Sequence, residues 1–305
     1  MNAILVTGAG GTLGRALLRR LAECQPRWPV VGLDVRPVPG PRAAERFSVL
    51  TVPFGGPFTS EQREILKPVT HVLHLAAEMQ GAAVPDGKRW TRLADPVRHL
   101  GALTAALPLV RHLVFASSYM VYATPPRDLV TEDHQIGPIN VYAWGKCAVE
   151  AYLRCLPVAS CVLRFAGIYG PGVPLELGRS IMQVVSAAVQ GSQIALYRPG
   201  TNLRNHLYID DAVQALYLAA AEEWRGTFNV AGPRAVSVRE VVDTVELVAG
   251  RPLPVRWYEG EPGWDAVLDT RLLAARHGFR AATDPSDGLR EYYRWARAGY
   301  GSGSR

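Results

Sequence analysis

Three glycines near the N-terminus, Gly8, Gly11 and Gly14, join an apolar segment, residues 3–8, to a segment with helical spacing of leucines, residues 12–24. Glycines at a strand-to-helix turn let the backbone turn tightly, approach a ligand closely and pack the helix against the strand. Amide groups at the beginning of such a helix attract phosphates. The turn predicts a β–α unit that binds a pyrophosphate, with a plain glycine-rich connection as the alternative.

The same alternation of apolar and helical segments continues to about residue 165. Five more segments have the length and composition of buried strands: residues 29–34, 47–52, 70–76, 111–118 and 158–167. Apolar strands that alternate with helices are typical of parallel βαβ units. We therefore predict an α/β fold with a Rossmann-type doubly wound parallel sheet.

An acidic residue stands at the position where dinucleotide-binding folds hold the adenosine ribose. Asp34 ends the second predicted strand, 20 residues after Gly14. A carboxylate there accepts hydrogen bonds from the ribose hydroxyls and repels a 2′-phosphate, so we predict NAD as the cofactor rather than NADP. Arg36 is the opposing feature, because an arginine at this place could hold a 2′-phosphate.

Composition excludes several classes of protein. The chain has 305 residues, of which 48% are hydrophobic and 20% charged, as in an ordinary globular protein. It has no apolar run long enough to span a bilayer and no signal peptide, which predicts a cytoplasmic protein that binds no membrane. The net charge of +6 comes from scattered arginines without a basic run, which argues against nucleic acid. The four cysteines lack metal-binding spacing, so we predict no metal site.

Tyr142 and Lys146 lie four residues apart on a predicted helix, residues 140–152. Because the two side chains share one helix face, the lysine could prime the tyrosine as a base. Glu150, another four residues along, is a candidate ion-pair partner for the lysine. The alternative is a packed tyrosine and a lysine that extends its amine to solvent.

Taken together, these motifs resemble those of the extended short-chain dehydrogenase/reductases, and within them the NAD-dependent epimerase/dehydratase family. The resemblance covers nearly the whole chain. It is carried by the glycine turn, Asp34, HLAA (74–77), FASSYMVY (115–122), Tyr142 with Lys146, LRFAGIYGPG (163–172), LRNHLYIDDAVQAL (203–216) and GTFNVAG (226–232).

This resemblance implies a catalytic centre of Ser118, Tyr142 and Lys146. A phenol has a pKa near 10, and a nearby lysine cation and an oxidised nicotinamide both favour its phenolate. Ser118 would hydrogen-bond the reacting oxygen, with a strand-end cap as its alternative role. The implied cofactor-binding residues are Gly8, Gly11, Thr12, Leu13, Gly14, Asp34, Arg36, Leu75, Ala76, Ala77, Tyr142 and Lys146. The implied substrate-binding residues are Glu78, Ser118, Tyr119 and Arg204.

The same resemblance implies two domains and a sugar substrate. We expect an NAD-binding domain of residues 1–165 and about 203–231, a substrate-binding lobe of about 166–202 and 232–299, and a flexible tail of 300–305. The leading hypothesis is a nucleotide-sugar 4-epimerase that oxidises a carbinol transiently. The alternatives are a net NAD-dependent dehydrogenase or reductase acting on a smaller substrate without a diphosphate, and a non-catalytic dinucleotide-binding regulator.

Several positions depart from the family pattern. Tyr119 and Met120 follow Ser118 where dehydratases usually carry an acid, which disfavours dehydratase chemistry. Arg98 stands in place of an asparagine in the segment that helps relatives dimerise, so a homodimer is left open. Glu261 stands where a second arginine would hold a diphosphate, while His74 is expected to be structural.

Overall fold

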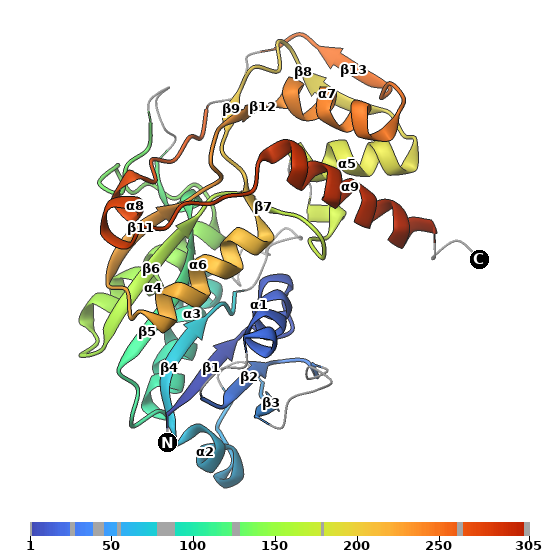
Figure 1. The fold of residues 1–305 in the computed structure, drawn as a ribbon. Helices are drawn as coiled ribbons and strands as arrows, with labels where there is room; N and C mark the ends of the chain where they lie inside the picture. The colour runs from blue at the N-terminus through green and yellow to red at the C-terminus, as the bar shows by residue number, and fades with distance from the viewer. Residues whose placement is uncertain are drawn as a thin grey trace. The chain divides into compact units, whose positions relative to one another are not determined.

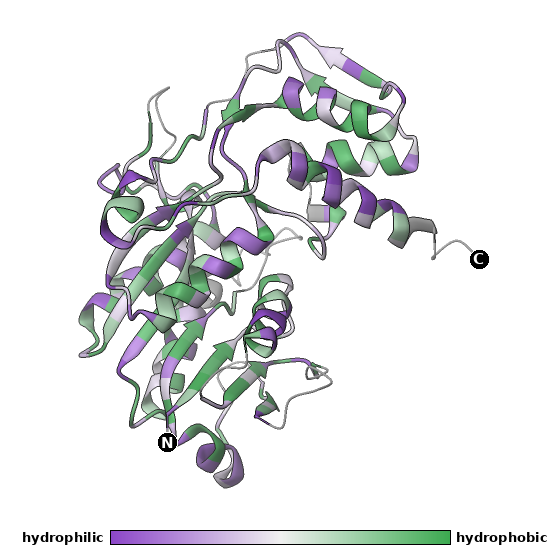
Figure 2. Cartoon of the chain, in the orientation of Figure 1, coloured by the Kyte–Doolittle hydropathy of each residue, from purple (hydrophilic) through white to green (hydrophobic). Residues whose placement is uncertain are grey.

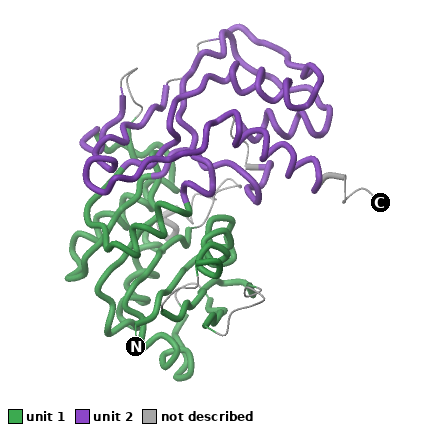
Figure 3. Tube along the Cα trace, viewed as in Figure 1, with its two compact units in different colours: residues 1–123, 135–164, 213–228 green, residues 124–134, 165–212, 229–305 purple. Residues whose placement is uncertain are grey.

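Residues 2–24, 28–38, 46–53, 56–77, 89–123, 129–177, 180–260 and 265–301 are described by the computed structural model. The chain forms two compact units (Figure 3). The first comprises Met1–Ala123, Gln135–Arg164 and Val213–Phe228, and the second comprises Thr124–His134, Phe165–Ala212 and Asn229–Arg305.

A single sheet forms the centre of the first unit (Figure 1). Among the described residues it has seven strands in the order β11-β6-β5-β4-β1-β2-β3, and the neighbouring pairs from β3 to β5 are parallel. The strands are β1 (Ala3–Thr7), β2 (Val30–Asp34), β3 (Phe47–Thr51), β4 (Val69–His74), β5 (His112–Ser118), β6 (Ala159–Phe165) and β11 (Gly226–Val230). The predicted doubly wound α/β fold is therefore confirmed.

Helices cover both faces of this sheet (Figure 1). They are α1 (Thr12–Glu23), α2 (Ser60–Leu66), α3 (Arg89–Ala105), α4 (Val141–Cys155) and α6 (Ile209–Ala221), with a short 3-10 turn, η2 (Tyr119–Val121). On one face α1 and α6 lie side by side, and Arg20 Nη2 donates to Gln214 Oε1 over 3.1 Å. On the other face α3 packs along α4.

Burial in the core explains why the strands could be predicted from the sequence. Every residue of β1, β4 and β5 is buried, as expected for strands covered on both faces. Figure 2 shows β1 as mainly hydrophobic. One apolar cluster joins the sheet to α3 and α4, and it includes Leu5, Val72, Leu113, Phe115, Leu100, Leu103, Val149 and Leu153.

The second unit consists of short strand pairs and packed helices. Its strand pairs are β7 (Ile168–Tyr169) with β10 (Leu207–Tyr208), β9 (Leu203–Arg204) with β12 (Val236–Ser237), and β8 (Ile194–Tyr197) with β13 (Val255–Tyr258). Its helical segments are η3 (Leu175–Leu177), α5 (Ser180–Gln190), α7 (Val238–Ala249), α8 (Arg271–His277) and α9 (Pro285–Gly301). Among them α5, α7 and α9 pack against one another.

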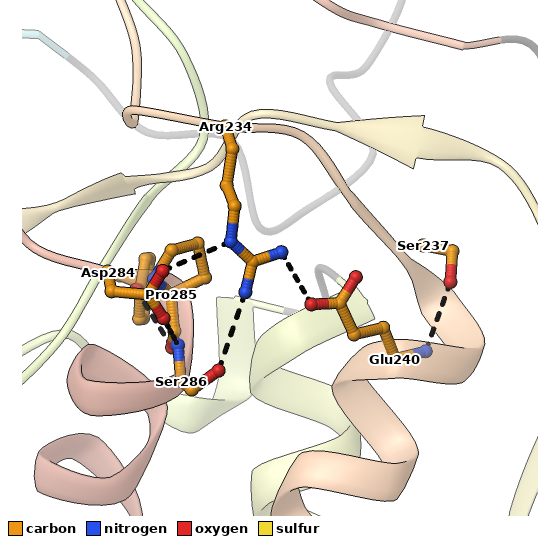
Figure 4. A network of polar contacts seen from close by, with 7 residues as sticks. Arg234, Ser237, Glu240, Asp284, Pro285 and Ser286 are labelled. Carbon is orange, nitrogen blue, oxygen red and sulfur yellow. Dashed lines mark hydrogen bonds and ion pairs between the residues drawn. The ribbon is translucent and has the colours of Figure 1, made fainter.

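Arg234 ties the first turns of α7 and α9 together (Figure 4). Its guanidinium donates to Glu240 Oε1 over 2.5 Å, to Asp284 Oδ2 over 3.1 Å and to Ser286 Oγ over 3.4 Å. Both carboxylates lie near helix N-termini, where negative charge is favourable. Ser237 Oγ accepts from the backbone N–H of Glu240 and caps α7.

The observed units differ from the expected domains at their boundaries. Residues 203–212 fall in the second unit, whereas the sequence predicted them in the first together with residues up to 231. The last segment of the first unit begins only at Val213 and ends at Phe228. At the C-terminus α9 continues to Gly301, so residues 300 and 301 are helical and do not belong to the expected tail. No helix of the described chain is long and apolar enough to cross a membrane.

Candidate functional site

The glycine turn between β1 and α1 uses its three glycines in three different ways. Gly8 has a left-handed φ of +70°, and a Cβ there would lie 2.8 Å from the backbone nitrogen of Ala76. A Cβ on Gly14 would lie 2.1 Å from the carbonyl oxygen of Gly8, so α1 packs directly on the turn. At Gly11 a Cβ would meet only the Gly8 oxygen, at 3.1 Å, which leaves the start of α1 open.

Asp34 is held in place by the turn itself. Its side chain is 7% exposed, and Oδ2 accepts a hydrogen bond of 2.8 Å from the backbone N–H of Gly10. Oδ1 accepts from the backbone N–H of Arg36 over 3.1 Å, while the Arg36 side chain is exposed. The carboxylate is therefore held beside the turn by two backbone amides of the protein. The Gly10 contact could not be predicted from sequence spacing.

The segment after β4 adjoins the same turn. The backbone N–H of Leu75 donates to the carbonyl of Thr7, and that of Ala76 donates to Thr7 Oγ1, both over 3.2 Å. Ala77 is exposed next to them, and Glu78 lies outside the described residues. Thr12 and Leu13 begin α1 and are half-buried. The predicted cofactor residues from β1, α1, β2 and the end of β4 are thus brought together.

Tyr142 and Lys146 lie in the first half of α4. The helix begins after Asn140, whose Oδ1 accepts from the backbone N–H of Ala143 over 2.9 Å. Lys146 is 5% exposed, and its Nζ donates to the carbonyl of Ala116 over 2.5 Å. The same nitrogen lies 5.5 Å from the ring centroid of Tyr142. The lysine therefore points into the protein toward β5, which contradicts the alternative of a solvent-directed amine.

Burial changes the charge of this lysine. Loss of water around the amine lowers the pKa of Lys146 to about 7, and the negative charge of Glu150 opposes the shift. Near neutral pH the amine can therefore exist in both protonation states. A group of this kind can respond to a nearby proton transfer, which a surface lysine with an ordinary pKa would not do.

Ser118 ends β5, and Tyr119 begins the 3-10 turn that follows it. Ser118 is 4% exposed, and its Oγ accepts from the backbone N–H of Met120 over 3.3 Å, so it does cap this turn. Because the oxygen acts as acceptor in that bond, the hydroxyl proton remains available for another oxygen. Tyr119 is half-buried, and α4 contacts both β5 and η2.

Lys146 and its candidate partner Glu150 each bond to another group: Lys146 to the Ala116 carbonyl and Glu150 to Arg164. Glu150 instead forms a two-bond ion pair with Arg164 of β6, through Arg164 Nη2 to Oε2 at 2.7 Å and Nε to Oε1 at 3.2 Å. It also accepts from Ser117 Oγ over 2.5 Å. Helical spacing brought Glu150 close to Lys146, but an arginine fork matches a carboxylate better than an ammonium does.

Arg204 belongs to the second unit, in β9. Its side chain is half-buried, and its backbone pairs with Val236 and Ala266. The adjacent Asn205 exchanges two hydrogen bonds with the backbone of Leu268, of 2.9 and 3.0 Å, which an aspartate could not do because it lacks the donor. Glu261 lies outside the described residues.

A family model of the NAD dependent epimerase/dehydratase family matches residues 4–231. The chain belongs to this family. The match spans most of the first unit and the beginning of the second, including the glycine turn, the end of β5 and α4. The protein is therefore an NAD-dependent enzyme of the short-chain dehydrogenase/reductase type, as its motifs predicted.

Relatives agree with this assignment over most of the chain. A UDP-glucose 4-epimerase of Mycolicibacterium smegmatis is 28% identical over 81% of this chain and 83% of its own length. A solved structure of MoeE5 in complex with UDP-glucuronic acid and NAD is 28% identical, covers 97% of this chain and 99% of its own, and has a TM-score of 0.78. A solved structure of the UDP-glucose 4-epimerase of Thermus thermophilus in complex with NAD is 25% identical. It covers 97% of this chain and 99% of its own, with a TM-score of 0.78.

His74 is buried and bonded within the fold, as expected for a structural residue. It ends β4, is 5% exposed, and its Nδ1 lies 2.8 Å from Thr7 Oγ1. Burial lowers the pKa of His74 to about 3, and the nearby charges of Lys146 and His99 act in the same direction. The ring is therefore neutral in the folded protein near neutral pH.

His74 should make the fold sensitive to mild acid. An unfolded chain protonates this histidine near pH 6.5, while the folded chain does not until about pH 3. Because the unfolded state binds the proton first, stability falls as pH drops below 6.5, by about 1.4 kcal/mol per pH unit for one proton. Replacing His74 by asparagine should remove this contribution. Chemical denaturation between pH 7.5 and 5 should show a shallower loss of unfolding free energy for His74→Asn than for wild type, and parallel slopes would contradict the assignment.

Proposed function

We propose that this protein is an NAD-dependent nucleotide-sugar 4-epimerase. The observation that carries the proposal is the arrangement on α4, where a buried Lys146 lies next to Tyr142 and points toward the end of β5. The similarity to UDP-glucose 4-epimerases over at least four fifths of the chain supports the substrate class.

The first unit offers groups that fit NAD. Gly11 and the first amides of α1 would receive the pyrophosphate, and Asp34 would accept hydrogen bonds from the adenosine ribose. Leu75, Ala76 and Ala77 would pass beside the cofactor, and Lys146 would reach the nicotinamide ribose. When bound, NAD supplies the redox chemistry, by accepting a hydride from the sugar carbon and returning it to the ketone.

The chain's own residues would move the proton and position the sugar. Tyr142 would take the proton of the sugar hydroxyl and give it back after the ketone has presented its other face. The Lys146 ammonium would stabilise the phenolate form of Tyr142. The Ser118 hydroxyl would donate to the reacting oxygen, which its role as a cap permits. Tyr119 and Glu78 would contact the sugar, and Arg204 an anionic group of the substrate.

The two residues after Ser118 favour epimerisation over elimination. A dehydratase usually carries a carboxylic acid directly after the serine or threonine as its second acid or base, and neither Tyr119 nor Met120 is one. Transient oxidation and return of hydride need only Ser118, Tyr142 and Lys146. A homodimer and a cytoplasmic location remain predictions from the sequence.

A substrate screen tests the proposal. The purified protein is incubated with UDP-glucose, UDP-glucuronic acid and their free sugars, while the epimer ratio and NADH absorbance are followed together. A 4-epimerase changes the epimer ratio without accumulating NADH. Accumulation of NADH would identify a net dehydrogenase instead, and a preference for free sugars would remove the diphosphate and the proposed role of Arg204.

Asp34 should make the enzyme select NAD. Its carboxylate lies beside the turn, where a 2′-phosphate would meet its negative charge, so NAD should bind at least about tenfold more tightly than NADP, or ~1.4 kcal/mol. Isothermal titration calorimetry with both cofactors measures the ratio. Asp34→Asn should reduce the preference, and equal affinities in the wild type would indicate instead that Arg36 holds the phosphate.

A further inference from the structure

A buried polar network links the elements that carry the proposed catalytic residues. Glu150 lies on α4, is 3% exposed, and forms its two-bond ion pair with Arg164 of β6, which is 5% exposed. Arg164 Nη1 also donates to the Tyr122 hydroxyl over 3.0 Å, just after η2. A charge pair this deeply buried gives weak net stability, because desolvation offsets its attraction, so stability alone does not account for it.

The network reaches the end of β5 through Ser117. The Ser117 hydroxyl donates to Glu150 Oε1 over 2.5 Å, so Glu150 holds the residue directly before Ser118. Just before Ser117 on the same strand, the carbonyl of Ala116 and the ring of Phe115 receive Lys146 Nζ, at 2.5 Å and 4.7 Å from the ring centroid. Glu150 and Lys146 therefore both bind α4 to β5, at the adjacent residues Ser117 and Ala116.

The charge of Glu150 also acts on Lys146. Around the lysine amine, the titratable groups are Tyr142 and Glu150 on α4 and the neutral His74 of β4, and β5 contributes an uncharged carbonyl and an aromatic ring. Of these groups, only Glu150 carries a negative charge that favours the ammonium against desolvation. Cys147 lies next to the lysine in sequence, and burial raises the pKa of its thiol, so it stays neutral.

We propose that Glu150, held by Arg164, is a positioning residue that fixes Ser118 relative to α4 and favours the ammonium form of Lys146 beside Tyr142. It acts through Ser117 on the strand and through its charge on the lysine, and it touches neither substrate nor cofactor. The inference rests on the proposed role of Tyr142 and Lys146.

Two variants separate the positioning contact from the charge. Ser117→Ala removes the hydroxyl and keeps the ion pair, so turnover should fall by about threefold to tenfold while the Lys146 titration is unchanged. Glu150→Met/Arg164→Met removes both charges together and fills their space with apolar side chains, which avoids leaving one buried charge unpaired. This double variant should lower the Lys146 pKa by about one unit, which reduces its ammonium form at pH 7 about fivefold. Together with the lost contact to Ser117, this should lower turnover by about 15-fold to 50-fold.

The lysine can be observed directly, because the chain contains only Lys67, Lys88 and Lys146. Protein labelled with ¹³C-lysine gives one Cε resonance for each, and Lys146→Met assigns the buried one. Its titration is followed by NMR without substrate, and NAD affinity is measured alongside and should stay within about fivefold of wild type. Glu223→Gln is the matched control, since it removes the ion pair with Arg111 and changes the hydrogen bond to His71 at the amino-terminal ends of β5 and β4, and it should leave both turnover and the titration unchanged.

Three results would contradict the proposed role of Glu150 or separate it from the proposed function. A folded double variant with wild-type turnover and an unchanged Lys146 titration would overturn it and make the network purely structural. If the double variant does not fold, unchanged turnover in Ser117→Ala overturns the positioning contact. If the wild type turns over no nucleotide sugar while the double variant still shifts the Lys146 titration, the proposed function fails and the control of the lysine charge by Glu150 stands.

Discussion

Replacing Tyr142 by phenylalanine is expected to lower turnover by about 10² to 10⁴, which is the usual cost of losing a general base. The change removes one oxygen and keeps the ring that packs at the start of α4. Fold and NAD affinity should therefore be close to those of the wild type. The measurement is turnover of the nucleotide sugar identified by the screen, with NAD binding by calorimetry and the thermal midpoint of unfolding determined on the same preparation.

Tyr152→Phe provides a matched control on the same helix. Tyr152 is half-buried on α4, and its hydroxyl lies near Gly101 of α3, whereas the Lys146 amine bonds to Ala116 of β5. Removing that hydroxyl should leave turnover within about threefold. If Tyr142→Phe also kept wild-type turnover on a confirmed substrate, Tyr142 would be an ordinary packed residue of an amphipathic helix, and the spacing to Lys146 would have no catalytic meaning.

The first unit was predictable because its strands are covered on both faces. Burial on both faces favours apolar sequence, and β1, β4 and β5 are buried at every residue, although Thr and His interrupt the apolar sequence of β4. In the second unit several strands have only two residues, as in β7 and β9, which is too short for any periodicity to develop. The segment 167–178, which is rich in Gly and Pro, accordingly contains β7 and η3, neither of which shows a periodic pattern in the sequence.

In the candidate site, too, contacts between residues near in sequence were predictable, and contacts between distant residues were not. The spacing of Tyr142 and Lys146 on one helix face is local, and the structure has both on that face. The partner of Glu150 is not local, because Arg164 reaches it from β6 and only the folded sheet brings the two together. For the same reason sequence spacing suggested that Asp34 faces a ribose, but not that the Gly10 amide already holds its carboxylate.

Alanine at Gly11 and at Gly14 should weaken NAD binding in both cases, but only alanine at Gly14 should also destabilise the fold. Gly14→Ala places a Cβ at 2.1 Å from the Gly8 carbonyl oxygen, closer than any real contact, so α1 must move off the turn. Overpacking of this kind typically costs about 1–3 kcal/mol or more. The variant should unfold at lower denaturant concentration and lose NAD affinity together with the shape of the turn.

Gly11→Ala should keep the fold and lose the cofactor. Gly11 has φ of −70° and ψ of 167°, which alanine adopts easily, and its added methyl meets only the Gly8 oxygen at 3.1 Å. Its free energy of unfolding should therefore stay within about 1 kcal/mol of wild type, since alanine also restricts the unfolded chain. The methyl would occupy the space at the start of α1 that the pyrophosphate needs, so NAD affinity should fall at least about tenfold. Denaturation and NAD titration of both variants test the pair. A Gly11→Ala protein that binds NAD as the wild type does would mean that the phosphates do not approach the backbone at this glycine.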